Sequence, residues 1–333
     1  MILLFVNINN NIRVMFFFSD NLGDNLNNIL LRKMTYRKIQ FYDTQKKIDI
    51  KSDYDRDIQK LNEVAKTDLI FIGSILEIIS NTTYNFQINR KKNKNFLNKC
   101  YYKLYDFFHP LIIFGAGFIS QNLKNELYLR NIKVIAVRGN ITLKRLINNG
   151  VKIKNSVVLA DPGLLFPFIF NLANFNNTKK YELCVIPHYV DINNILISAK
   201  IKVNKYNILN ITESPYKFII SLLECKRVLS SSLHGLIISD SLGIPNMRFV
   251  VSDNIGGGDY KFEDYYSSYN LSLPLKIDLR KTFFTENQLN EIKSNYKITR
   301  YMVREKQCQL LIHFPYGLNK EFKKFKNLCN KSI

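Results

Sequence analysis

The stretch KRVLSSSLHGLIISDSLGIPNMRFV, residues Lys226–Val250, decides the class of fold. Its apolar start, Lys226–Leu229, predicts a buried strand, and His234–Leu242 carries apolar residues at helical spacing. Gly243 is a normal helix stop, and Asn246–Val250 predicts a second strand. A strand, a helix and another strand in succession are typical of a parallel sheet that is covered by helices.

Short apolar runs alternate with helical segments on both sides of this stretch. The alternation predicts an α/β protein built from βαβ units. Further strands are predicted at Arg13–Phe18, Asp68–Ile72, Leu111–Phe114, Lys133–Val137, Ser156–Leu159, Tyr181–Ile186 and Tyr206–Ile211. Further helices are predicted at Leu26–Lys33, Ile141–Asn149 and Pro215–Glu224.

One stretch, Phe166–Lys180, interrupts the alternation with a proline and four asparagines. We interpret it as a linker between two Rossmann-like halves, residues 1–170 and 171–310, which fits a chain of 333 residues at about 100 to 200 residues per domain. Two parallel-sheet halves with a cleft between them form the GT-B architecture. The basic residues 311–333 have helical spacing and are expected to pack back on the N-terminal half.

The charge of the chain departs from the globular average. It has 48 Lys and Arg against 27 Asp and Glu, a formal net charge of +21, and a pI near 9.6. Such a charge indicates an acidic partner, which leaves nucleic acid, an anionic membrane face and phosphorylated small molecules open. With 46% hydrophobic residues the chain can bury a core, so general disorder is excluded.

Several other classes of protein are disfavoured. No run approaches 18 apolar residues, so no spanning helix is predicted, and Met1–Val6 lacks the basic leader of a signal peptide. The five cysteines are widely spaced and never form CxxC. This spacing predicts reduced thiols in a cytoplasmic protein, with neither disulfides nor a zinc site.

The loop after the strand Lys226–Leu229 carries the strongest candidate site. Three serines, Ser230–Ser232, precede the predicted helix, and His234 lies at its start. Backbone N–H groups and hydroxyls at a helix N-terminus bind anions, and a histidine beside them can transfer a proton. The alternative, a capping serine with an incidental histidine, accounts for Ser232 only.

The loops after three other predicted strands hold further candidates. Arg138 is suited to grip a carboxylate or phosphate, with a surface salt bridge as the alternative. His188 either faces the cleft or is a packed histidine. Asp161 belongs to a turn that is mostly structural, and it is a secondary candidate.

Two glycine turns lie in the N-terminal half. In Asn21–Asp24, Gly23 allows close approach of a ligand, and Asp24 either holds or deprotonates a sugar hydroxyl or caps the next helix. Gly115 and Gly117 form a GxG whose third glycine is replaced, so a dinucleotide site is rejected. They line the cleft or form a structural turn.

Taken in order, these loops resemble the polysaccharide pyruvyl transferase family. Many members read RLHG where this chain has Ser232 before Leu233, so one expected arginine is absent. The resemblance runs over residues 14–272. It rests on NLGD (Asn21–Asp24), VRGNITLKRL (Val137–Leu146), ADPGLLFP (Ala160–Pro167), IPHY (Ile186–Tyr189), SSLHGLIISDSLGIP (Ser231–Pro245) and, as in exopolysaccharide ketal-pyruvate transferases, KFEDYYSSYNL (Lys261–Leu271).

The resemblance implies a GT-B-like transferase that moves pyruvate from phosphoenolpyruvate onto two hydroxyls of a sugar, leaving a ketal and free phosphate. It implies no metal and no cofactor, an acceptor side in the N-terminal half and a donor side in the C-terminal half. His234 is expected to be the general acid, with Asp24 or His188 as the base. The implied donor-binding residues are Arg138, Ser231, Ser232, Leu233, Gly235 and Lys261, and the implied acceptor-binding residues are Asn21, Gly23, Gly115, Gly117 and His188.

Further possibilities remain at this point. Arg227 or Arg248 could supply the missing cation if either faces the cleft. A GT-B glycosyltransferase would hold a nucleotide diphosphate at the same helix start, whereas nucleic-acid binding is disfavoured because the basic run Arg90–Lys103 matches no known motif. The remaining positive charge fits a peripheral contact with the inner face of an anionic membrane, where a lipid-linked glycan acceptor would lie.

Overall fold

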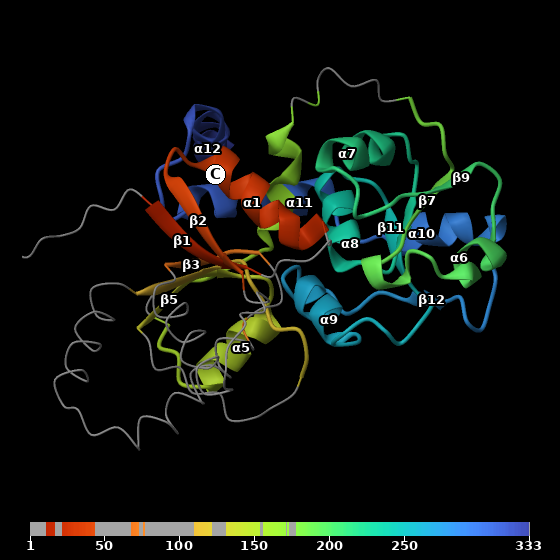
Figure 1. Ribbon diagram of the computed structural model, residues 1–333, viewed down its shortest axis with the longest axis horizontal. Coiled ribbons are helices and arrows are strands. Elements are labelled where there is room, and N and C mark those ends of the chain that lie inside the picture. Colours follow the sequence, from red (N-terminus) through yellow and green to blue (C-terminus); the bar gives the residue numbers. More distant parts are fainter. Residues whose placement is uncertain are drawn as a thin grey trace, which may run out of the picture.

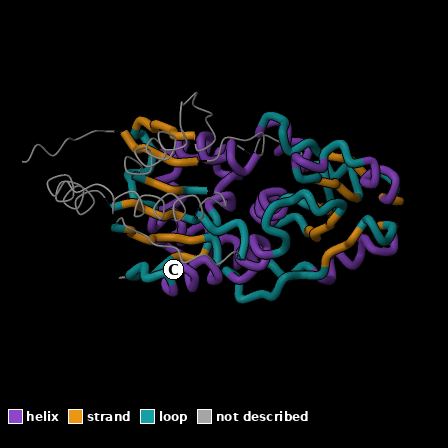
Figure 2. Tube along the Cα trace, turned by 60° about the horizontal axis from the view of Figure 1, so that its bottom comes forward, coloured by secondary structure: helices purple, strands orange, loops and turns teal. Residues whose placement is uncertain are grey.

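The computed structural model describes residues 11–16, 22–43, 68–72, 76, 110–121, 131–153, 156–170, 172 and 178–332. In this part of the chain the strands form two larger parallel sheets, one in each half, and a two-stranded parallel pair. Figure 2 shows the strands of the two larger sheets at opposite ends of the molecule, with helices between them. The predicted α/β class of fold with two parallel-sheet halves is confirmed.

The first sheet has the strand order β2-β1-β3-β4-β5-β6. Its strands are β1 (Asn11–Phe16), β2 (Lys38–Asp43), β3 (Leu69–Ile70), β4 (Leu111–Phe114), β5 (Ile132–Val137) and β6 (Val158–Leu159). The described helices of this half are α1 (Leu22–Met34) and α5 (Asn140–Asn148), and Figure 1 places them on opposite sides of the sheet. β2 was not predicted, since its sequence KIQFYD mixes polar and apolar residues, as an edge strand can.

The second sheet has the order β12-β11-β10-β7-β9, and β8 pairs separately with β13. The strands are β7 (Leu183–Ile186), β8 (Ile201–Lys202), β9 (Tyr206–Ile208), β10 (Val228–Ser230), β11 (Asn246–Val250), β12 (Lys276–Asp278) and β13 (Phe284–Thr285). The helices are α6 (Ile195–Lys200), α7 (Pro215–Leu223), α8 (Leu233–Ser241), α9 (Tyr260–Ser267) and α10 (Leu289–Asn295), with short 3₁₀ helices η3 (Tyr189–Asp191) and η4 (Glu286–Gln288).

The predicted linker is partly wrong. Its first residues belong to a 3₁₀ helix, η1 (Pro162–Ile169), in which Leu165 and Phe166 are fully buried. The reason is that the apolar run FPFIF packs into the core that the two halves share. The largest cluster of buried apolar side chains contains Val14 of the first sheet, Phe166 of η1 and Ile186 of the second sheet.

The C-terminal helices α11 (Arg300–His313) and α12 (Lys320–Ser332) lie against the N-terminal half. A β-bridge joins Leu318 to Thr35, directly after α1, and the Asn319 N–H donates to the Met34 carbonyl at 2.7 Å. Figure 1 shows α12 beside α1 and β2. No helix among the described residues is long and apolar enough to cross a membrane.

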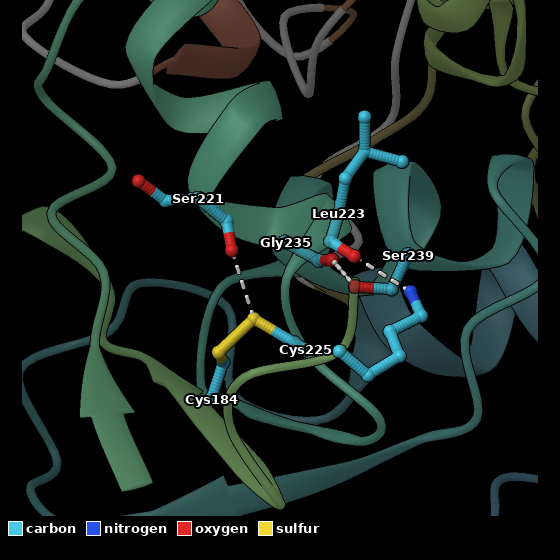
Figure 3. Close-up of a disulfide and its surroundings, with 7 residues drawn as sticks. Cys184, Ser221, Leu223, Cys225, Gly235 and Ser239 are labelled. Carbon is cyan, nitrogen blue, oxygen red and sulfur yellow. Dashed lines mark hydrogen bonds between the residues drawn. A yellow bond between two sulfur atoms is a disulfide. The ribbon is translucent and has the colours of Figure 1, made fainter. Parts of the chain in front are cut away.

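The expectation of reduced cysteines is wrong for four of the five. Cys184 and Cys225 form one disulfide (Figure 3), and Cys308 and Cys329 form another, with Cα atoms 5.7 and 5.3 Å apart. The partners are 41 and 21 residues apart in sequence, and they meet because the segment before β10 packs beside β7 and because α12 packs against α11. Cys100 lies outside the described residues. The cysteines therefore no longer support a cytoplasmic location.

Candidate active site

The loops that follow β5, β6, β7 and β10 converge where the two halves meet. They carry Arg138, Asp161, His188 and the Ser230–His234 segment, and each of these residues is buried. A Cβ added at Gly163 in the first half would lie 3.0 Å from the Asp161 carboxylate and 3.7 Å from the His234 ring. Acidic and imidazole side chains from different halves therefore flank one glycine.

The serine loop is held by its own hydroxyl groups. The Ser230 hydroxyl donates to the Ile186 carbonyl at 3.0 Å and accepts from the Ser232 N–H at 3.1 Å. The Ser231 hydroxyl accepts from the His188 N–H at 2.8 Å and so ties the loop after β10 to the loop after β7. Ser232 is the N-cap residue of α8, but its side chain makes no capping hydrogen bond, so the capping alternative is not supported.

His234 is the second residue of α8, and its Nε2 has no hydrogen-bond partner among the described residues. Burial, together with the positive charges of Arg138 and Lys261, lowers the pKa of His234 to about 3. The imidazole is therefore neutral at neutral pH in the ligand-free protein. A buried, unpaired ring nitrogen at the positive end of a helix is poised to meet an incoming polar ligand.

His188 lies close to the same positive charge. Burial and the charge of Lys261 lower its pKa to about 3. Its Nδ1 accepts from the Val190 N–H at 3.4 Å, which leaves Nε2 to carry the proton of the neutral ring. Lys261 itself, on α9, is only 7% exposed. Two neutral histidines and a buried lysine thus lie close together, and donor binding by Lys261 stays a prediction.

Arg138 is not the surface salt bridge that the alternative envisaged. Its Nε donates to Asp264 Oδ2 at 2.9 Å, and the two side chains are 1% and 0% exposed. Its Nη2 donates to the Phe118 carbonyl at 2.5 Å. The positive charge of the guanidinium lowers the pKa of His234. It also partly offsets the burial that raises the pKa of Asp161. It is a buried cation at the junction of the two halves.

Residues 5–253 match the family model of the polysaccharide pyruvyl transferases. The chain belongs to the polysaccharide pyruvyl transferase family. The matched range includes Arg138, Asp161, His188 and His234, whereas Lys261 and Asp264 lie beyond its end. The resemblance inferred from the motifs is confirmed, and with it membership of a family of transferases.

This pyruvyl transferase family member is also similar to a viral protein. It is 33% identical over 171 residues to the uncharacterized protein L143 of Acanthamoeba polyphaga mimivirus, and the match covers 48% of this chain and 55% of that protein. The chain therefore spans about half of the length of the curated relative that it matches.

The chain is also similar to two solved structures, each at 10% sequence identity. UDP-GlcNAc 2-epimerase of Methanocaldococcus jannaschii, in complex with UDP-GlcNAc and UDP, has a TM-score of 0.40, with coverage of 97% of this chain and 99% of that chain. A second UDP-N-acetylglucosamine 2-epimerase has a TM-score of 0.43, with coverage of 92% and 96%. The likeness concerns the fold alone.

In this family member Asp161 is a stronger candidate for proton transfer than the sequence indicated. Burial raises the pKa of its carboxyl to about 6, with a further rise from Asp264, against the lowering effects of the Gly163 N–H and Arg138. It accepts from the Gly163 N–H at 2.8 Å and so caps η1. It therefore has a structural role, as predicted, and also a pKa suited to proton transfer near pH 6.

Asp264 was missed, because no pattern in the sequence marks one acid of KFEDYYSSYNL as buried. Its only signal is that it lies three residues after Lys261, so that both lie on one side of α9. The pairing with Arg138 spans 126 positions in the sequence. Only the packing of α9 between the two halves, visible in Figure 1, makes it possible.

The glycine turn after β4 has a packing role. A Cβ at Gly115, where φ is +86°, would overlap with the Pro162 ring, and a Cβ at Gly117 would overlap with the Arg138 guanidinium. Both contacts support the structural alternative for these two predicted acceptor residues. Gly235 likewise lets α8 approach β10, because a Cβ there would overlap with the Ser230 hydroxyl.

The remaining candidates are spread over the fold. Asn21 lies outside the described residues, and Gly23 and Asp24 lie in the first turn of α1, where only the backbone is described. Leu233 is buried in an apolar cluster with Leu164 and Phe262 and so packs rather than presents a polar group. The predicted acceptor-binding site therefore stays a prediction.

The two alternative cations each pair with an acid. Arg227 pairs with Glu182 at 3.3 Å on the surface, and Arg248 pairs with Asp259 at 2.6 Å. The Arg248 guanidinium also lies over the Phe262 ring, 3.8 Å from its centre. Within the described ranges, no group of three or more His, Cys, Asp or Glu is arranged to hold a metal ion.

Proposed function

We propose that the protein transfers pyruvate from phosphoenolpyruvate to two hydroxyls of a sugar in a glycan, forming a pyruvate ketal. The proposal rests on one observation. Arg138 and Lys261 are buried close to the unpaired His234 Nε2 at the start of α8. Phosphoenolpyruvate bears a carboxylate and a phosphate close together, and two cations at a helix N-terminus complement both groups. The family of the chain supports this assignment.

The reaction needs two additions to one carbon atom. Protonation of C3 makes C2 electrophilic, the first hydroxyl oxygen then bonds to C2, and a base takes the hydroxyl proton. The second hydroxyl oxygen next bonds to C2 while the bond from C2 to the phosphate oxygen breaks. Its proton leaves to a base, inorganic phosphate departs, and both sugar oxygens remain on C2 as a ketal.

His234 is our candidate for the proton that reaches C3, under one condition. Its pKa of about 3 in the ligand-free protein follows partly from the charges of Arg138 and Lys261. A donor with several negative charges offsets those cations, so its binding raises the pKa of His234 and allows the ring to take up a proton. His188, Asp24 and now Asp161 are the candidates for the base.

The arginine that many family members carry before Leu233 is Ser232 in this chain. Arg227 and Arg248 each pair with an acid, Glu182 and Asp259. We assign its role to Lys261, whose charge acts on both histidines. This assignment keeps the donor site cationic without the missing side chain.

The decisive experiment measures phosphate release from phosphoenolpyruvate with a panel of glycan acceptors. We expect His234→Ala and Arg138→Ala to lose about 100-fold or more of the wild-type rate. Arg227→Ala, which removes only a surface ion pair, is the matched control and should keep the wild-type rate. Full activity in both site variants would refute the site.

A nucleotide-sugar glycosyltransferase is the competing function, since the start of α8 would also suit a diphosphate. Thermal stabilisation by phosphoenolpyruvate and by a panel of nucleotide sugars separates the two donors. Stabilisation by nucleotide sugars alone would overturn pyruvyl transfer.

We further propose that the acceptor is lipid-linked and that the protein contacts an anionic membrane. The support is a basic surface: Lys320, Lys323 and Lys324 of α12 are exposed, next to exposed Arg32 and Lys33 of α1. Vesicles with phosphatidylserine should bind the wild type, and the variant with all three α12 lysines changed to Glu should bind much less. Equal binding to neutral vesicles contradicts the proposal.

A further inference from the structure

The helix α5 does not cap its own N-terminus. Its N-cap residue is Gly139, which has no side chain. The Asn140 N–H donates instead to the Ser267 hydroxyl at 2.8 Å, and the Thr142 N–H donates to Asp264 Oδ1 at 2.8 Å. Both acceptors belong to α9, so a helix of the C-terminal half caps a helix of the N-terminal half.

Gly139 is required for this arrangement. A Cβ at that position would overlap with the carbonyl oxygen of Asp264. The Arg-Gly pair of the sequence therefore has two separate purposes: Gly139 admits the backbone of α9, and Arg138 pairs with the carboxylate that α9 brings.

The carboxylate of Asp264 joins several groups of the other half. Oδ2 accepts from Arg138 Nε at 2.9 Å and from the Thr142 hydroxyl at 2.7 Å, while Oδ1 accepts from the Thr142 N–H. Asp264 is fully buried. One side chain thus fixes both the first turn of α5 and the direction of the Arg138 guanidinium.

Lys261 lies on the same helix, three residues before Asp264, so the docking that Asp264 provides also places Lys261. We propose that Asp264 is a positioning residue of the donor site, which sets Arg138 and Lys261 beside His234 by docking α9 on α5. The inference rests on the proposed function for the identity of the donor. It assigns a role in the reaction to a residue beyond the part of the chain that the family model matches.

Two variants of α9 test the proposal. Asp264→Asn keeps the size of the side chain but removes its charge, and we expect it to raise the KM for phosphoenolpyruvate by about tenfold or more, with a smaller change in kcat. Ser267→Ala is the matched control, since it removes one hydrogen bond between α9 and α5 but leaves the contacts of Asp264 with Arg138 and Thr142 in place. It should keep KM and kcat within about twofold of the wild type.

A double variant distinguishes positioning from a general loss of stability. If Asp264 acts through Arg138 and Lys261, then Asp264→Asn should cause a smaller loss in the Arg138→Ala background than in the wild type, because only the part that acts through Lys261 remains. Fully additive losses, or a Ser267→Ala variant as impaired as Asp264→Asn, would overturn the proposal. Should Asp264→Asn not fold, Asp264→Glu replaces it: a raised KM supports positioning, and a wild-type KM overturns it.

Binding of inorganic phosphate, measured by calorimetry, separates this inference from the proposed function. Asp264→Asn should weaken phosphate binding about tenfold, whichever donor the protein uses. If the wild type releases no phosphate from phosphoenolpyruvate but shows this loss of phosphate binding, then the proposed function fails and the positioning role stands. Unchanged phosphate binding in Asp264→Asn overturns the positioning role alone.

Discussion

The hydroxyl of Tyr265 on α9 donates a hydrogen bond of 2.7 Å to the buried carboxyl group of Asp240 on α8. This bond links α8, whose second residue is His234, to α9, which carries Lys261. Asp240 also accepts from Asn246 Nδ2 at 2.6 Å. Burial raises the pKa of Asp240 to about 6, while the two hydrogen bonds hold it lower than burial alone would.

Tyr265→Phe should therefore destabilise the protein by about 1–3 kcal/mol, because it leaves a buried carboxyl group with one partner fewer. The loss should be greater at pH 7.5 than at pH 5. The variant raises the pKa of Asp240 further. The buried carboxylate therefore lowers the free energy of unfolding at neutral pH, whereas the protonated group at lower pH does not. Urea unfolding at both pH values measures it, with the exposed Tyr301→Phe as the control. An equal loss at both pH values would contradict this explanation.

His234→Gln should make the stability of the fold less sensitive to acid. The pKa of His234 is about 3 in the folded chain against its usual 6.5, so between these values the unfolded chain binds a proton that the folded chain does not. Stability is therefore lost as the pH falls from about 6.5 towards 3, by up to about 1.4 kcal/mol per pH unit for this group.

Between pH 7 and pH 5 the variant should lose about 2 kcal/mol less of its free energy of unfolding than the wild type does. Other titrating groups act in both proteins and cancel in the difference. The exposed His313→Gln is the matched control. Parallel stability curves for the wild type and His234→Gln would show that the ring is not held neutral by its surroundings.

Gly117→Ala should impair catalysis by displacing Arg138, because the new methyl group would overlap with the guanidinium. We expect phosphate release to fall about tenfold or more, since small displacements of a binding group are costly. Gly317→Ala, where nothing lies within 4 Å of the new Cβ, is the control. Wild-type rates in Gly117→Ala would mean that the position of Arg138 does not limit the reaction.

Replacing both Cys308 and Cys329 by serine should lower the free energy of unfolding by about 3 kcal/mol, given the loop that the bond closes. The two residues are 21 positions apart and link α11 to α12. Denaturant unfolding with and without dithiothreitol measures the effect. The reductant should lower the stability of the wild type more than that of the variant, in which only Cys184–Cys225 remains to be reduced. An identical response would show that the bond does not form in solution.

Much of the fold could be read from local patterns. The predicted strands Leu111–Phe114 and Asn246–Val250 coincide with β4 and β11, because short apolar runs between helix stops leave little choice of period. The loops after the strands also drew attention to Arg138, His188 and His234. Polar edge strands such as β2 were not predicted, since half of their residues face water and give no apolar signal.

The sequence by itself determined the α/β alternation, the helix start at the three serines and the family, because hydrophobic periodicity, helix stop residues and motifs are local properties of the chain. Only the tertiary structure decided the neutral state of His234, the pairing of Arg138 with Asp264 and the two disulfides. Each of these depends on burial and on charged or sulfur groups that lie far away in sequence. Proton affinity and pairing respond to distance in space, which no linear pattern in this chain encodes.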